Sequence, residues 1–195
     1  MKSINSLAIG SIPVGIFAIL FVVGFAPIND TSGIFGGSIG EQGTYTFTVY
    51  GPDGEIKSTQ TSHNEVTNEG MECVADFVFG TTGCTGEVVF TYIALGTGVV
   101  AVDETDTALG TEVGACTRLQ DATPALDSAT TNQRTVTISQ TFSGAACEGS
   151  AFGEVGLFDA VTTGNMLARA LISPTINLGA GDTLQIDYDI VLNNS

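Results

Sequence analysis

The chain has 195 residues, and its 5 lysines and arginines against 21 aspartates and glutamates give a formal net charge of −16. So few cations cannot neutralise a phosphate backbone, and the net charge would repel one, which excludes nucleic-acid binding and adhesion to anionic lipid through a basic face. Hydrophobic residues make up 43% of the chain, so it is not a disordered acidic tail and can bury the core of one domain.

The first element is an uncharged, apolar run from Leu7 to Ile28, which follows a single cation at Lys2. The run is long enough to cross a bilayer as a helix, and a basic start before an apolar stretch is also typical of an export signal. Ala26 suits a cleavage site, whereas Pro27 directly after it opposes cleavage. We therefore expect residues 1–28 to be an export signal or a membrane-anchor helix, and the protein to be secreted, extracellular or on the cell surface.

The segment 29–43 is rich in Gly and Ser, which is typical of a flexible linker. Its apolar residues Ile34, Phe35 and Ile39 have no local partner in the sequence pattern. They could add a strand to the sheet edge of a neighbouring copy. Alternatively, the segment only tethers the following domain to a membrane helix, and the sequence favours neither interpretation.

Residues 44–195 form the expected domain, which begins with a β-hairpin. Residues 44–50 alternate polar and large side chains, with Tyr45, Phe47 and Val49 on one face, as in a half-buried strand. Turn residues at 51–54 lead into a second arm over residues 55–61.

A helix is expected over residues 68–79, because Asn68 can cap its start and Gly80 can end it. An apolar stripe at helical spacing predicts that one face packs against the core. The members of this stripe are Met71, Val74, Ala75 and Val78.

The rest of the domain is predicted to be short strands separated by Gly, Asn, Pro and Asp, without crossover helices. This pattern predicts a mainly β fold, an antiparallel β-sandwich of the Ig-like or jelly-roll-like kind, with one short helix. Residues 119–132 are predicted to be a loop. The expected strands cover residues 88–95, 134–142, 152–158, 166–172 and 183–192.

Four cysteines form an even set without the two-residue spacing of a zinc or redox motif. In an oxidising compartment we expect the local pairs Cys73–Cys84 and Cys116–Cys147, although three connectivities are compatible with the sequence. Two formal glycosylation acceptors also fit an exported protein, Asn29 and Asn193.

The sequence offers little for catalysis. The only histidine, His63, lies in a polar stretch, and no nucleophile-elbow motif is present. Paired carboxylates could cleave glycosides, but without Trp a sugar platform is hard to build. We therefore expect a protein that is not an enzyme and that needs no organic cofactor.

Acidic clusters are the candidate for a ligand site. Asp103, Glu104 and Asp106 lie together, and hard oxygen ligands suit calcium. The spacing is not that of a regular calcium loop, so the alternative is that these acids are solvated and serve solubility. A second group of acids flanks the last strand: Asp182, Asp187 and Asp189.

Five segments occur in a recognisable order: YIALGTG (92–98), DTALGTEV (106–113), VGLFDA (155–160), MLARALIS (166–173) and LGAGDTLQIDYDIVL (178–192). Over residues 62–192 this series resembles β-sandwich proteins of phage and virus tails or appendages, and similar domains of exported archaeal surface proteins. The resemblance implies structural, non-enzymatic work and supplies no catalytic residues.

The leader and the cysteines differ from the virion pattern and favour an extracellular structure. We expect a subunit of an extracellular, pilus-like filament whose partners are copies of itself, joined by strand exchange. The alternative is a membrane-anchored surface protein, or a virion tail or appendage protein, that binds a partner through its loops. In either case the membrane would be contacted only through residues 7–28.

Overall fold

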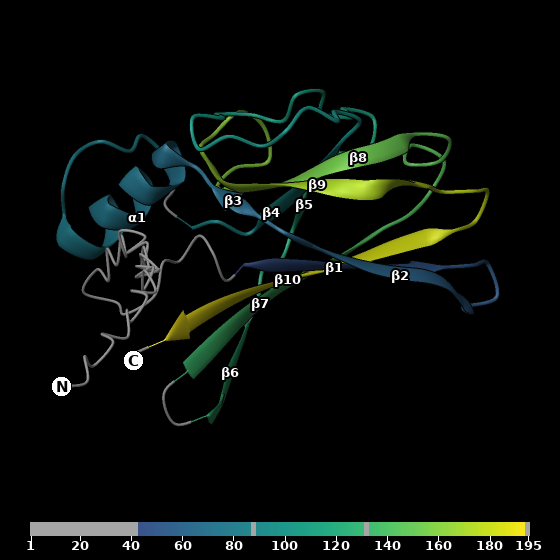
Figure 1. The fold of residues 1–195 in the computed structure, drawn as a ribbon, viewed down its shortest axis with the longest axis horizontal. Coiled ribbons are helices and arrows are strands. Elements are labelled where there is room, and N and C mark those ends of the chain that lie inside the picture. The colour runs from purple at the N-terminus through teal and green to yellow at the C-terminus, as the bar shows by residue number, and fades with distance from the viewer. Residues whose placement is uncertain (1–42, 87–88, 131–132, 194–195) are drawn as a thin grey trace, which may run out of the picture. The chain divides into compact units, whose positions relative to one another are not determined.

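The structure is a computed structural model that describes residues 43–86, 89–130 and 133–193 (Figure 1). The expected export signal or anchor and most of the expected linker, including Asn29, Ile34, Phe35 and Ile39, lie outside the described residues. The elements in chain order are β1 (Thr44–Tyr50), β2 (Ile56–His63), β3 (Glu65–Val66), α1 (Asn68–Phe79), β4 (Tyr92–Gly96), β5 (Leu119–Gln120), β6 (Ala125–Thr130), β7 (Gln133–Phe142), β8 (Ala151–Phe158), β9 (Met166–Asn177) and β10 (Thr183–Asn193).

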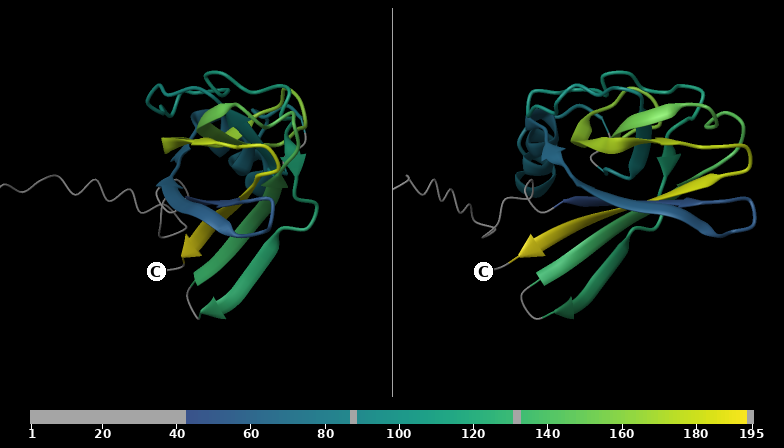
Figure 2. Two further views of the ribbon diagram at one scale, coloured as in Figure 1. Left: turned by 90° about the vertical axis from the view of Figure 1, so that its right-hand side faces the viewer. Right: turned by 45° about the vertical axis from the view of Figure 1, so that its right-hand side comes forward.

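The strands form two antiparallel five-stranded sheets, which the two views of Figure 2 show as two layers. The first sheet has the order β2-β1-β10-β7-β6, and the second has the order β3-β9-β8-β4-β5. The expected antiparallel β-sandwich with one helix is therefore confirmed. Among the described residues, no helix is both long and apolar enough to cross a membrane.

The main core lies between the sheets and follows the alternation of each strand. Tyr45, Phe47 and Val49 of β1 are buried, as predicted, and the ring of Tyr45 stacks on that of Tyr188 of β10 at 4.1 Å between centroids. The second sheet contributes Phe152, Val155 and Leu157 of β8 and Ala168, Ala170 and Ile172 of β9.

A smaller apolar cluster lies on the opposite face of the second sheet. Phe158 belongs to it while Leu157 belongs to the main core, because successive side chains of a strand point to opposite faces. Leu109 covers Phe158 and Met166 there. The chain between β4 and β5 therefore forms a cover over the outer face of this sheet.

Helix α1 begins and packs differently from the prediction. Its N-cap is Thr67, whose side chain accepts a hydrogen bond from the Gly70 N–H, whereas Gly80 ends it in a left-handed conformation, as expected. Of the predicted core stripe, Val74 packs against the core, whereas Met71 and Val78 are exposed, so the prediction holds only in part. A Cβ on Gly70 would lie 2.5 Å from the Leu167 Cα. Absence of that atom lets the helix approach β9 through Gly70.

The prediction of a loop over residues 119–132 is also wrong, because β5 and β6 lie within it. β6 pairs with β7 from Ala125↔Thr137 to Thr130↔Gln133, and β5 pairs with β4. Leu126, the one large apolar residue of β6, is exposed. An edge strand that buries so little apolar surface lacks the alternation from which strands are predicted.

Candidate functional site

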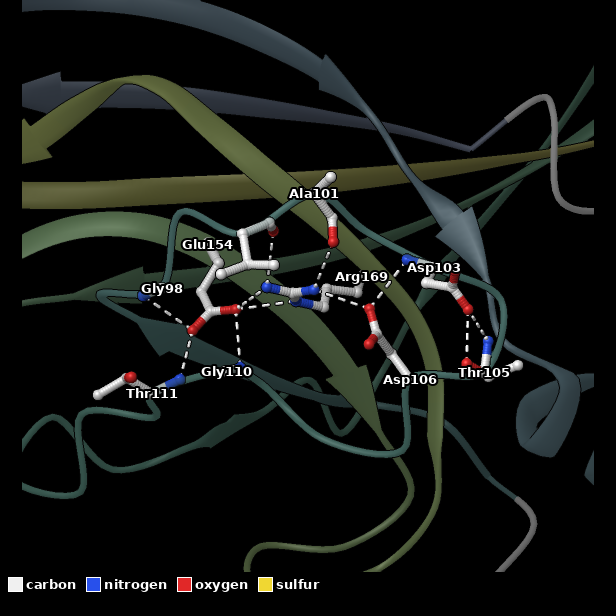
Figure 3. A network of polar contacts seen from close by, with 10 residues as sticks. Gly98, Ala101, Asp103, Thr105, Asp106, Gly110, Thr111, Glu154 and Arg169 are labelled. Carbon is white, nitrogen blue, oxygen red and sulfur yellow. Dashed lines mark hydrogen bonds and ion pairs between the residues drawn. The ribbon is translucent and has the colours of Figure 1, made fainter.

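A buried ion pair lies on the outer face of the second sheet, between Glu154 of β8 and Arg169 of β9 (Figure 3). The Arg169 Nε and Nη2 donate to the Glu154 Oε2 at 2.8 and 2.7 Å, and its Nη1 donates to the Asp106 Oδ2 at 2.7 Å. The guanidinium also donates to the carbonyl oxygens of Val100 and Ala101. Arg169 therefore fixes the chain segment 97–113, the cover loop, to the sheet.

Backbone amides of the cover loop close the other side of the Glu154 carboxylate. Its Oε1 accepts from the Gly98 N–H at 2.9 Å and from the Thr111 N–H at 2.7 Å, and its Oε2 accepts from the Gly110 N–H at 3.0 Å. These amides belong to, or directly follow, two copies of the letters Ala-Leu-Gly-Thr, at residues 94–97 and 108–111.

The two copies lie antiparallel to each other. The Thr97 N–H donates to the Thr111 carbonyl at 2.8 Å, and the Val113 N–H donates to the Leu95 carbonyl at 2.9 Å. This short repeat is the one signal in the sequence that could have located the Glu154 site. Its physical role is to present backbone donors from two segments to one carboxylate.

The environment of the pair keeps both partners charged. Burial acts to raise the pKa of Glu154, but the amides of Thr111 and Gly110 and the Arg169 guanidinium outweigh it and hold that pKa below its usual value. Burial acts to lower the pKa of Arg169, but hydrogen bonds to Asp106 and Glu154 prevail and raise it. The amides and the guanidinium therefore stabilise Glu154 in its ionised form within the network.

A second arginine holds the end of the same cover. The Arg118 Nε and Nη2 donate to the Glu112 carboxylate, each at 2.8 Å, and its Nη1 donates to the carbonyl oxygens of Ala160 and Thr163. The guanidinium carbon lies 3.6 Å from the centre of the Phe158 ring, a cation–π contact. Two buried arginines thus connect the cover to the strands beneath it.

Most of the segments that carry the sequence resemblance meet at this cover. Residues 92–98 and 106–113 form its two ends, 155–160 provide Phe158, and 166–173 provide Arg169. The residues of these segments therefore supply the glycine turns, the backbone amide donors and the ion pairs that connect the cover loop to the second sheet.

The acids predicted to bind calcium have other partners. Asp106 pairs with Arg169, and the Asp103 carboxylate accepts from the Thr105 N–H at 2.9 Å and from its hydroxyl, which lowers the pKa of Asp103. The backbone carbonyl of Glu104 accepts a hydrogen bond from the Asn68 N–H. Across the described ranges, no three His, Cys, Asp or Glu side chains could hold a metal ion. The calcium prediction for Asp103, Glu104 and Asp106 is therefore not supported, because a guanidinium already neutralises Asp106.

The three acids around the last strand, Asp182, Asp187 and Asp189, also contact separate partners. Asp182 pairs with Lys57 at 2.6 Å, and this hydrogen bond lowers the pKa of Asp182. Asp187 accepts from Ser139 and Gln185, and Asp189 accepts from Thr137. The contacts of Asp187 with Ser139 and of Asp189 with Thr137 connect β10 to β7, its neighbour in the first sheet.

His63 is exposed at the end of β2, with its Nδ1 3.3 Å from the Thr44 hydroxyl oxygen. Asn193, the predicted glycosylation acceptor, is the last residue of β10. Neither position adds a chemical group to the network around Glu154.

The cysteines form two disulfides, Cys73–Cys84 and Cys116–Cys147, the local pairs expected from the sequence. Disulfides persist in oxidising environments. The protein therefore belongs to a non-reducing, extracellular type of environment.

The sheet edges remain as a candidate for intermolecular contact. β3 and β5 have two residues each. β9 extends beyond β3 but contains Pro174 in the extension, and proline blunts an edge. By contrast β2 has eight residues without proline, from Ile56 to His63, and most of its side chains are exposed. It is longer than β6, the other end strand of the first sheet, which has six residues and directly follows Pro124.

Comparisons of this chain with protein-family models, with curated proteins and with solved structures found no match.

Proposed function

We propose that the protein is an exported, non-enzymatic structural subunit of an extracellular filament, in which residues 29–43 of one copy add a strand to the β2 edge of the next copy. The observation that carries this proposal is the position of β2, Ile56–His63, as the last strand of the first sheet. β2 also approaches β9, where the Gln60 side chain donates to the Pro174 carbonyl oxygen. Exposed backbone donors and acceptors of such an edge pair readily with another extended chain.

The position of Gly43 favours a donor from another copy. Gly43 leads directly into β1, and Thr44 of β1 lies opposite His63 at the end of β2. A strand antiparallel to β2 on its outer edge would finish beside Ile56, which lies opposite Tyr50. Six residue steps of about 3.4 Å separate this end from Thr44 by about 20 Å. Two residue steps, from residue 42 to residue 44, cannot cover this distance. An antiparallel donor strand whose residue 42 lies beside Ile56 must therefore belong to a neighbouring copy.

The internal charges support a structural role. The Glu154 carboxylate is fully buried, and both of its oxygens accept hydrogen bonds from groups of the protein. These hydrogen bonds lower its pKa. The donor segment has apolar residues at positions 34, 35 and 39, and these can pack on the edge of a receiving sheet.

Substitution of the three apolar residues tests the donor. In the variant Ile34→Ser, Phe35→Ser, Ile39→Ser, and in protein lacking residues 29–43, we expect purified material to stay monomeric by analytical ultracentrifugation and electron microscopy. The matched control, Thr31→Ala, Ser32→Ala and Ser38→Ala, changes as many residues of the same segment and should form filaments normally. Normal polymerisation of both test variants would exclude strand exchange by this segment.

A further inference from the structure

The core-facing side of the first sheet continues beyond the second sheet. Leu184, Ile186 and Tyr188 of β10 belong to the main core. Ile190 and Leu192 follow at the same spacing of two residues and therefore lie on the same face of β10. Figures 1 and 2 show the C-terminal end of β10, with the adjoining parts of β7 and β6, extending away from the second sheet. The second sheet therefore does not cover this end of the face.

Apolar side chains from three strands form this surface, which we call the uncovered inner face: Leu126, Val136, Ile190 and Leu192. Val136 of β7 lies opposite both Leu126 of β6 and Ile190 of β10, so these three form a row across the sheet. Val136 and Ile190 are partly buried against the core, whereas Leu126 and Leu192 are 64% and 41% exposed. An apolar row that is continuous with the core is typical of a surface that another segment covers.

The N-terminal segment enters the domain beside this face. Thr44, the first residue of β1, lies opposite Asp189 of β10, so Gly43 is one step further along, level with Ile190. The Gly43 carbonyl is held there because it accepts from the Asn64 N–H at 3.3 Å. The residues that precede Gly43 therefore begin at the margin of the uncovered inner face.

Buried polar groups at the same margin lack partners. The Tyr45 hydroxyl and both polar atoms of the Asn64 side chain make no hydrogen bond to any described residue. A Cβ on Gly43 would lie 1.9 Å from the Asn64 Oδ1 and 2.5 Å from the hydroxyl oxygen of Tyr188, on which Tyr45 stacks. Leaving a buried polar group unpaired is costly, and the backbone of a segment that crosses this margin can supply donors and acceptors.

The apolar residues just before Gly43 are close enough to cover this face. An extended chain advances about 3.4 Å per residue, so Ile39 can lie up to about 14 Å from Gly43 and Phe35 up to about 27 Å. β6 is three strand spacings from β1, or about 14 Å, across β10 and β7. From this placement we infer that Ile34, Phe35 and Ile39 of the free subunit pack on the uncovered inner face of their own copy.

The short connection favours the same copy over a second molecule. A segment joined to the domain by a few residues acts at an effective concentration in the millimolar range, whereas a second copy loses translational freedom on binding and carries the same net charge of −16. Residues 32–40 contain no charged side chain, so they can be buried without desolvating an ion.

This contact goes beyond the proposed function, because it concerns the free subunit and does not require that copies assemble. If strand exchange is also correct, the same three apolar residues leave their own sheet before they join β2 of a neighbour. The free subunit then holds its donor in reserve.

Photo-cross-linking of the full chain tests the contact. We place p-benzoylphenylalanine at position 35 in isotopically light protein, mix it with heavy protein at a dilution at which analytical ultracentrifugation shows only monomers, and identify the cross-linked peptides by mass spectrometry. We predict cross-links within single light chains to Leu126, Val136, Ile190 or Leu192, or to residues adjacent to them. Cross-links confined to other surfaces, cross-links only between light and heavy copies, or absence of cross-links would overturn the contact.

Hydrogen exchange of residues 34–39 measures the same contact independently. We expect their exchange to be at least about tenfold faster in the double variant Leu126→Ser, Leu192→Ser than in the original protein, because burial of one leucine side chain already corresponds to about a factor of ten. The matched control Val99→Ser, Val100→Ser changes two apolar side chains of the cover loop that are 68% and 72% exposed, and it should leave this exchange unchanged. Equal effects of the two pairs, or exchange in the original protein as fast as in an unstructured peptide, would contradict the contact.

Monomers and polymers of the same labelled protein separate the two proposals. Cross-links from position 35 to the uncovered inner face in monomers, with none to β2 in mixed polymers, would reject strand exchange alone. Cross-links to β2 in polymers, with none to the uncovered inner face in monomers, would reject the contact within one copy alone.

Discussion

Arg169 is the residue on which the cover of the second sheet depends most. It is 2% exposed and donates to a carboxylate that is fully buried, Glu154, and to a second one, Asp106. Removing one member of a buried ion pair leaves an uncompensated charge in a poorly solvated site. In contrast the Lys57 side chain of the Lys57–Asp182 pair is 44% exposed, so water screens that interaction.

This difference predicts the effect of two matched substitutions. Arg169→Met should lower the free energy of unfolding by about 3–5 kcal/mol, whereas Lys57→Met should change it much less, because water screens the exposed pair. Urea unfolding followed by circular dichroism measures both. Equal losses would show that the buried network does not hold the cover loop.

The lowered pKa of Glu154 predicts how stability depends on pH. Because the pKa is lower in the folded state than its usual value of 4.5, the folded protein binds fewer protons than the unfolded chain in this range. The contribution of Glu154 is therefore complete above about pH 5 and is lost as pH falls through the lowered value. Asp103 and Asp182, also lowered from 3.8, act in the same direction.

Urea unfolding at pH values from 7 to 2 tests this dependence. We expect the free energy of unfolding to be nearly constant at the upper end and to fall below about pH 4.5. In Arg169→Met the fall should be smaller, because one of the groups that lowers the pKa of Glu154 is absent. A stability that rises on acidification would contradict the assignment.

At the scale of elements, the packing of α1 depends on a missing side chain. A Cβ at position 70 would come 2.5 Å from the Leu167 Cα and 2.8 Å from the Leu167 carbonyl oxygen, and backbone atoms of a strand cannot move aside cheaply. We expect Gly70→Ala to displace the helix from β9 and to lower the free energy of unfolding by about 1–3 kcal/mol. The helix propensity of alanine would offset about 1 kcal/mol of the loss.

Gly114→Ala is the matched control, because a Cβ there meets nothing within 4 Å. It should leave stability within about 0.5 kcal/mol of the original. Thermal unfolding and hydrogen exchange of residues 68–79 measure the effect. Unchanged exchange protection of α1 in Gly70→Ala would show that the close approach is not required.

Elements with clear alternation could be predicted from the sequence, and those defined by their neighbours could not. The faces of β1 and the run of β10 follow the period of a buried strand. β6 was missed because its exposed Leu126 gives no such pattern. The stripe of α1 was assigned to the core because periodicity identifies an apolar face but not whether another element covers it. Gly70, which decides the packing, carries no hydrophobic signal.

The site was predictable only in part for a similar reason. The acids around Asp106 were recognised as a cluster, but their partner Arg169 lies far along the chain on β9. Sequence proximity therefore suggested a cation site where the fold supplies a guanidinium. Glu154 lies in an apolar strand, and only its contacts with amides from two distant segments reveal its role.

At the scale of the whole molecule, the protein is a disulfide-bonded sandwich, and we propose that another chain extends its first sheet at β2. The two disulfides and the arginine network stabilise each copy internally, while β2 presents eight residues of strand outward. The net charge of −16 keeps free copies apart, and salt screens this repulsion over about 8 Å at physiological ionic strength. At physiological ionic strength this repulsion therefore does not prevent a strand of one copy from pairing with a strand of another.

The most direct test of assembly by strand addition is to locate the donor segment in mixed polymers. Light protein with p-benzoylphenylalanine at position 35 is assembled with heavy protein and irradiated, and the cross-linked peptides are sequenced by mass spectrometry. The account predicts cross-links from light position 35 to heavy residues 56–63. Cross-links confined to single chains, or joining light and heavy copies elsewhere than at β2, would contradict it.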